Sequence, residues 1–113
     1  MAVQHDQLRV LYEAFNARHI ESALAGLHPD VVWANGLEGG TVKGRSAVRD
    51  YWTRQWQQID PRVEPQRFEG ENDEVVVEVR QVVRDRTGHL IAERTVYHYF
   101  RFEGGLVKVF EIR

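Results

Sequence analysis

The 113-residue sequence contains no cysteine. Disulfide bonds, thiol nucleophiles and cysteine-based zinc sites are therefore excluded, and a reducing compartment fits the composition. A run of about 18 apolar residues, which a membrane-spanning helix requires, occurs nowhere in the chain. The opening MAVQHDQLRV has neither the basic nor the apolar segment of a secretory signal. We therefore expect a cytoplasmic protein that does not bind a membrane.

The chain also lacks an excess of charge of either sign. Its 15 Lys and Arg residues face 17 Asp and Glu residues, for a net charge of -2. Such a balance provides no basic surface for nucleic acid. The histidines at positions 5, 19, 28 and 89 lack the spacing of a metal site, and no glycine pair is followed by the residues of a phosphate-binding loop. We expect no metal and no cofactor.

What is present is the composition of an ordinary globular protein, with 42% hydrophobic and 28% charged residues. The length suits one hydrophobic core, and no linker or repeat divides the chain. Residues 1–113 are therefore predicted to form a single domain.

The N-terminal half has the periodicity of helices. Apolar residues recur at helical spacing at positions 8, 11, 12 and 15, and again at 20, 23, 24 and 27. A third helical face contains positions 48, 52, 55, 56 and 59. Pro29 ends the second predicted helix, whereas Ser46 begins and Pro61 ends the third. The β-rich segment 31–35 and a glycine-rich loop separate the second helix from the third.

From residue 62 onward the period changes to two. Strands are predicted at 62–69, 74–84, 89–103 and 106–113, joined by short turns. Helices followed by a meander of strands indicate an α+β fold, with the helices on one face of an antiparallel sheet.

The Gly104-Gly105 turn allows the last strand pair to be aligned. A two-residue hairpin loop places Glu103 opposite Leu106, and counting outward places His98 opposite Glu111 on the inner face. A histidine beside a carboxylate can transfer protons, because the carboxylate fixes the imidazole tautomer. The alternative is a structural ion pair at the rim of the sheet.

The same alignment gives the outer face an apolar patch. Tyr99 would face Phe110 and Tyr97 would face Ile112. Such a patch is too apolar to remain in water. We therefore expect a homodimer formed through the outer face of the sheet.

The order of these elements carries a resemblance to a known family. The segments LYEAFNARHIESALAGLHPDVVWAN, KGRSAVRDYW and YHYFRFEGGLVKVFEIR resemble SnoaL-like domains of the nuclear transport factor 2-like superfamily. The resemblance covers nearly the whole chain. It implies a cone-shaped, curved antiparallel sheet packed by three N-terminal helices and enclosing a hydrophobic pocket. It also implies frequent dimers and activities that include ketosteroid isomerases, polyketide cyclases, limonene epoxide hydrolases and domains that only bind.

The functional residues of the isomerases are not retained. In this resemblance their catalytic aspartate corresponds to Asn35, their hydrogen-bonding tyrosine to Leu11 and their protonated oxyanion-hole acid to His98. The resemblance therefore does not imply isomerase chemistry of that design.

The epoxide hydrolases match in part. Their water-binding asparagine is kept as Asn35 and one of their catalytic carboxylates aligns with Glu111, whereas their tyrosine becomes Trp33. Their central arginine and second aspartate fall at Val79 and Gln81. At most half of that hydrolase machinery is therefore present.

These observations lead to a set of candidate residues. His98 and Glu111 are predicted as a proton-transfer pair, and Asn35 either orients a reacting oxygen or serves as a turn residue. A further group is predicted to line the pocket, unless its aromatic members are ordinary core residues. The predicted lining residues are Trp33, Trp52, Trp56, Tyr12, Phe15, Arg94 and Gln81.

The functional prediction is accordingly a pocket protein for small molecules. It would act without a cofactor, by general acid/base chemistry, on an apolar cyclic substrate that bears a carbonyl or an epoxide. The alternative is a dimeric domain that binds a ligand or a partner without catalysis.

Overall fold

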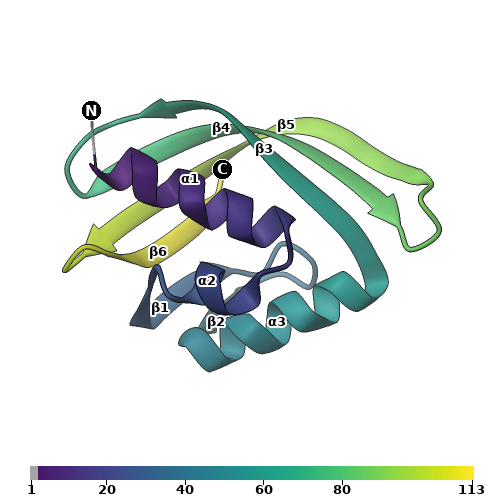
Figure 1. The fold of residues 1–113 in the computed structure, drawn as a ribbon, viewed down its shortest axis with the longest axis horizontal. Helices are drawn as coiled ribbons and strands as arrows, with labels where there is room; N and C mark the ends of the chain where they lie inside the picture. Colours follow the sequence, from purple (N-terminus) through teal and green to yellow (C-terminus); the bar gives the residue numbers. More distant parts are fainter. Residues whose placement is uncertain (1–2) are drawn as a thin grey trace.

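The computed structural model describes residues 3–113, in which three helices pack against one sheet (Figure 1). The helices are α1 (Val3–Asn16), α2 (Ile20–Leu24) and α3 (Arg45–Gln58). Within that range, no helix has the length and apolar content that crossing a bilayer requires. The second helix is shorter than predicted, because the chain is already extended from Leu27.

Six strands form a single sheet in the order β2-β1-β6-β5-β4-β3. The strands are β1 (Leu27–Ala34), β2 (Thr41–Lys43), β3 (Ile59–Glu69), β4 (Glu74–Asp85), β5 (Leu90–Glu103) and β6 (Leu106–Ile112). All neighbours are antiparallel except β1 and β6, which pair in parallel. The short strand β2 and the parallel pair were not predicted.

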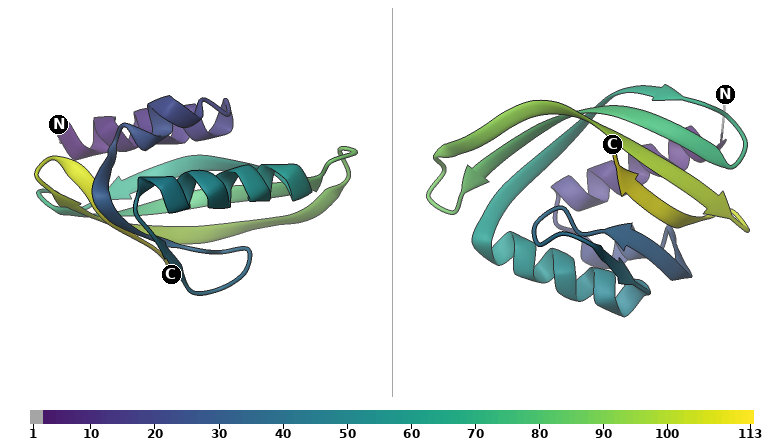
Figure 2. Two further views of the ribbon diagram at one scale, coloured as in Figure 1. Left: turned by 90° about the horizontal axis from the view of Figure 1, so that it is seen from below. Right: turned by 180° about the vertical axis from the view of Figure 1, so that it is seen from behind.

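The sheet curls around the helices without closing (Figure 2). Every second side chain of β4 and β5 points toward α1 and α3. Val75, Val77 and Val79 of β4 are fully buried, and Phe100 of β5 is 1% exposed. The α+β fold and the inward face of these two strands are confirmed.

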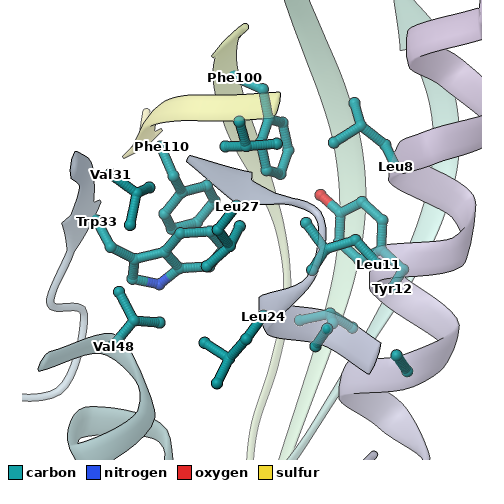
Figure 3. Close-up of a cluster of buried hydrophobic side chains, with 14 of the residues drawn as sticks. Leu8, Leu11, Tyr12, Leu24, Leu27, Val31, Trp33, Val48, Phe100 and Phe110 are labelled. Carbon is teal, nitrogen blue, oxygen red and sulfur yellow. The ribbon is translucent and has the colours of Figure 1, made fainter. Parts of the chain in front are cut away.

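Aromatic side chains form the centre of the core. The rings of Trp33 and Phe110 stack with their centroids 4.1 Å apart, and Tyr12 projects from α1 toward Phe100 (Figure 3). The indole of Trp52 on α3 lies edge-on to Trp33 at 5.2 Å. Both long helices are therefore packed on the sheet by aromatic contacts.

Asn16 connects the end of α1 to the open edge of β3. Its side-chain amide donates to the carbonyl oxygen of Val63 at 2.7 Å, and its carbonyl accepts from the Val63 N–H at 2.9 Å. Because β3 is the last strand of the sheet, these backbone groups have no neighbouring strand to pair with. The asparagine side chain takes the place of that strand.

Replacing Asn16 with Ala should lower the free energy of unfolding by about 2 kcal/mol, since a half-buried N–H and C=O lose their partners. Urea denaturation measures the change. Glu13→Ala, on an exposed position of the same helix, is the matched control. Equal losses in the two variants would show that the Asn16 bonds do not stabilise the fold.

A β-bulge in the last hairpin changes the predicted register. Val107 pairs with Phe102 as expected, but Val109 pairs with Arg101, so Lys108 is an extra residue on β6. Beyond the bulge, every side chain of β6 points to the face opposite to the one predicted. Phe110 consequently lies opposite Phe100 and is 4% exposed.

The predicted outer patch is therefore wrong in half of its members. Phe110 and Ile112 face inward, whereas Tyr97 and Tyr99 remain on the outer face. The Tyr99 hydroxyl donates to Glu74 at 2.6 Å. Dimerisation through this face stays a prediction, now with a more polar surface than expected.

Candidate functional site

A cavity of about 630 Å³ lies between the inner face of the sheet and the helices α1 and α3. Its size falls within the range of small-molecule sites. Most of its wall is aliphatic or aromatic. The lining residues are Leu11, Tyr12, Phe15, Trp33, Ala34, Asn35, Gly36, Leu37, Tyr51, Trp52, Gln55, Ile59, Pro61, Val63, Gln81, Val83, Ile91, Ala92, Arg94, Val96, His98, Phe100, Phe110 and Ile112.

Tyr12 and His98 form a buried polar pair in this wall. The Tyr12 hydroxyl lies 2.7 Å from Nδ1 of His98, and the two side chains are 4% and 6% exposed. α1 supplies the tyrosine and β5 the histidine. Burial lowers the pKa of His98 to about 4 and raises the pKa of the Tyr12 hydroxyl well above its ordinary value. Both groups are therefore neutral at physiological pH.

The hydrogen bond also favours one tautomer of His98. Among residues 3–113 the Tyr12 hydroxyl has no other acceptor, so donation from the hydroxyl to Nδ1, with the ring proton on Nε2, is the arrangement that uses the hydroxyl proton. Nε2 has no partner in this part of the chain, and it is not sealed off from solvent. The sole fully buried side-chain nitrogen or oxygen without a partner there is Nε1 of Trp56. In this tautomer, His98 presents an N–H donor to the cavity.

Six of the seven predicted lining residues line the cavity: Tyr12, Phe15, Trp33, Trp52, Gln81 and Arg94. Trp56 does not. It packs behind the wall against Phe15 at 5.3 Å between ring centroids, with the Arg18 guanidinium 5.1 Å above its ring. Helical spacing placed Trp56 on the right face of α3 but could not show that Trp56 packs against Phe15 without lining the cavity itself.

Asn35 lines the cavity, but its amide serves the loop that follows β1. The side-chain oxygen accepts from the N–H groups of Leu37 and Glu38 at 3.2 and 2.8 Å, and the side-chain nitrogen donates to Glu38 at 3.0 Å. These are the bonds of a turn-forming asparagine. Of the two predicted roles, this geometry matches the turn.

The predicted pairing of His98 with Glu111 is wrong. The bulge places Glu111 opposite Tyr99 on the outer face, where it is exposed and binds Arg113 at 3.0 Å. Ile112 takes the place opposite His98. The physical reason is that the bulge buries Phe110, which is worth about 1.5 to 3 kcal/mol, and keeps an ionised carboxylate out of an apolar wall.

Two polar cavity residues were not predicted. The Tyr51 hydroxyl accepts from the backbone N–H of Gly36 at 3.1 Å and from the Gln55 side chain at 3.3 Å. Their four-residue separation on α3 is a helical-face signal that the sequence does contain. Tyr12 was predicted as one of the aromatic residues that line the pocket. Its hydrogen bond to His98 was not predicted, because 86 residues separate the two positions. The resemblance had put the isomerases' tyrosine one position earlier, at Leu11.

A curled sheet with helices enclosing an apolar cavity defines the class of small α+β pocket proteins. The model of the SnoaL-like domain matches residues 8–110. The chain belongs to this family, within the nuclear transport factor 2-like proteins.

Solved structures share the same fold. An NTF2-like protein of unknown function from Burkholderia pseudomallei is 30% identical, with a TM-score of 0.88, covering 100% of this chain and 91% of the other. TerC, co-crystallised with polyporic acid, is 27% identical, with a TM-score of 0.84 and coverage of 96% and 88%. An LEH-like epoxide hydrolase of Mycobacterium tuberculosis is 15% identical, with a TM-score of 0.80 and coverage of 95% and 78%. No curated protein matches the sequence.

Proposed function

We propose that this protein binds an apolar, ring-containing small molecule in the cavity and that His98 donates a hydrogen bond to an oxygen of that molecule. The observation that carries the proposal is one neutral Tyr12–His98 pair in an otherwise largely apolar wall. Pockets of this composition take up apolar ligands and orient them by a few placed polar groups. TerC, which was co-crystallised with polyporic acid, supports a small organic molecule as the occupant.

The chemistry that the pair supports is activation of a carbonyl. A neutral imidazole that donates from Nε2 polarises a carbonyl oxygen and stabilises negative charge developing on it. Donation from the Tyr12 hydroxyl to Nδ1 fixes the required tautomer. With a pKa of about 4, His98 is a weak base at neutral pH, so the donor role is the one that this pair favours.

One observation favours binding without turnover as the second candidate. No aspartate or glutamate is among the residues that line the cavity. A reaction that removes a proton from the ligand would therefore need its base from water or from the ligand itself. In the second candidate the same cavity serves as a receptor.

The binding site can be tested with N-phenyl-1-naphthylamine, a neutral aromatic probe whose fluorescence rises in apolar surroundings. Val96 lies in the cavity wall between Arg94 and His98, so Val96→Trp should fill the cavity and weaken probe binding at least about tenfold, the loss expected when bulk replaces a ligand contact. The matched control is Thr95→Trp, because Thr95 is exposed on the opposite face of β5. Equal binding by both variants would place the probe elsewhere and contradict the proposal.

A further inference from the structure

The charge in the cavity lining is of one sign and lies at one end. Among the described residues that line the cavity, Arg94 is the single charged side chain, since His98 is neutral there and no carboxylate contributes to the lining. Arg94 lies on the same face of β5 as Val96 and His98. It is exposed, whereas His98 is buried, so the charge lies toward the mouth and the hydrogen-bond donor lies inside.

Arg94 is also free of the partners that occupy other arginines. Among residues 3–113 it makes no ion pair, and its register partner on β4 is the uncharged Gln81. The neighbouring residue Glu93 points to the outer face and binds Arg80 there. The guanidinium thus borders the cavity with its hydrogen-bond donors unused by the described residues.

Two carboxylates on segments that contribute to the cavity wall are already engaged. Glu38, on the loop after β1, accepts from Asn35 at 3.0 Å and pairs with Arg54 at 3.3 Å. Glu111 of β6 pairs with Arg113 on the outer face. These acidic groups therefore do not neutralise Arg94.

We propose that the ligand is an organic acid, whose rings fill the cavity and whose anionic group binds Arg94 at the mouth. The inference rests on the proposed binding function and adds the charge of the ligand. A guanidinium holds a carboxylate or a similar planar anion through two parallel hydrogen bonds. Residues 94 and 98 are four strand positions apart, about 13 Å along the backbone, so a ligand touching both ends is an elongated, multi-ring molecule.

A matched pair of probes separates charge from shape. 8-Anilinonaphthalene-1-sulfonate carries an anionic sulfonate on the skeleton of N-phenyl-1-naphthylamine, which is neutral. Arg94→Gln should weaken binding of the sulfonate about tenfold, the size expected for hydrogen bonds to a charged group, and change binding of the neutral probe less than about twofold. Arg94→Lys should retain part of the affinity for the sulfonate, because it keeps the charge and loses the fork geometry.

The control is Arg86→Gln, which removes the same charge from the exposed turn between β4 and β5. It should leave the affinities for both probes unchanged. Equal weakening of sulfonate binding in Arg86→Gln and Arg94→Gln, or unchanged binding in both, would overturn the anion preference alone. Failure of Val96→Trp to exclude the neutral probe would overturn the binding function and the anion preference with it.

Discussion

Phe100→Ala should lower the free energy of unfolding by about 4 kcal/mol, the usual loss for a fully buried phenylalanine. The Phe100 ring is 1% exposed and contacts Tyr12, Trp33 and Phe110 at centroid distances of 6.1, 6.4 and 5.1 Å. Removing it would leave a void where α1, β1, β5 and β6 meet. Domains of this size are stable by only about 5 to 15 kcal/mol, so the variant should be close to unfolding at moderate temperature.

Tyr97→Ala provides the comparison on the same strand. Tyr97 points outward and is 43% exposed, so its truncation should cost less than about 1 kcal/mol. Guanidinium denaturation of both variants measures the difference. Similar losses in the two would mean that Phe100 does not occupy the centre of the core.

Acid should destabilise the protein through His98. The ordinary histidine pKa of 6.5 applies to the unfolded chain, and burial lowers the pKa of His98 to about 4 in the folded protein. Between these values the unfolded chain binds a proton that the folded protein does not. The contribution of neutral His98 to the free energy of unfolding is therefore fully present above pH 6.5 and is lost as the pH falls toward 4. The loss amounts to roughly 3 kcal/mol over that window.

The His98→Gln variant separates the effect of His98 protonation on stability from the effect of carboxylates, which are protonated over a similar pH range. The difference in unfolding free energy between wild type and His98→Gln should shrink by about 1.4 kcal/mol per pH unit as the pH falls from 6.5 to 4. The control is His89→Gln, which removes an exposed histidine in the β4–β5 turn. Because His98 is intact in this variant, its free energy of unfolding should fall with decreasing pH as steeply as that of the wild type. A constant difference between wild type and His98→Gln would show that His98 is not buried in its neutral form.

Most of the fold could be predicted from local patterns. Helical spacing identified α1 and α3, alternation identified β3 to β6, and the order of these elements indicated α+β packing. The parallel pairing of β1 with β6 could not be predicted in this way, because it joins strands from opposite ends of the chain. Strand β2 has only three residues, too few for a periodic signal.

The candidate site shows where counting along strands fails. The inward parity of β4 and β5 was enough to place Gln81, Arg94 and His98 in the cavity wall. A single extra residue, Lys108, then reversed the faces of β6 and removed Glu111 from the site. Without the bulge, two apolar residues, Phe110 and Ile112, would both have faced outward, and this apolar pair on the outer face was the available signal for a bulge.

In the proposed site, neutral His98 presents its Nε2 proton to a ligand oxygen in the cavity. Long-range ¹H–¹⁵N NMR of the imidazole tests it, with flavone as a ring-containing ketone and N-phenyl-1-naphthylamine as an aromatic probe without a carbonyl. At about pH 6 we expect the neutral tautomer protonated on Nε2, and a shift of the Nε2 resonance when flavone binds that the carbonyl-free probe does not cause. Titration of His98 near its ordinary pKa, or displacement of the probe by flavone with both ring nitrogens unchanged, would contradict the claim.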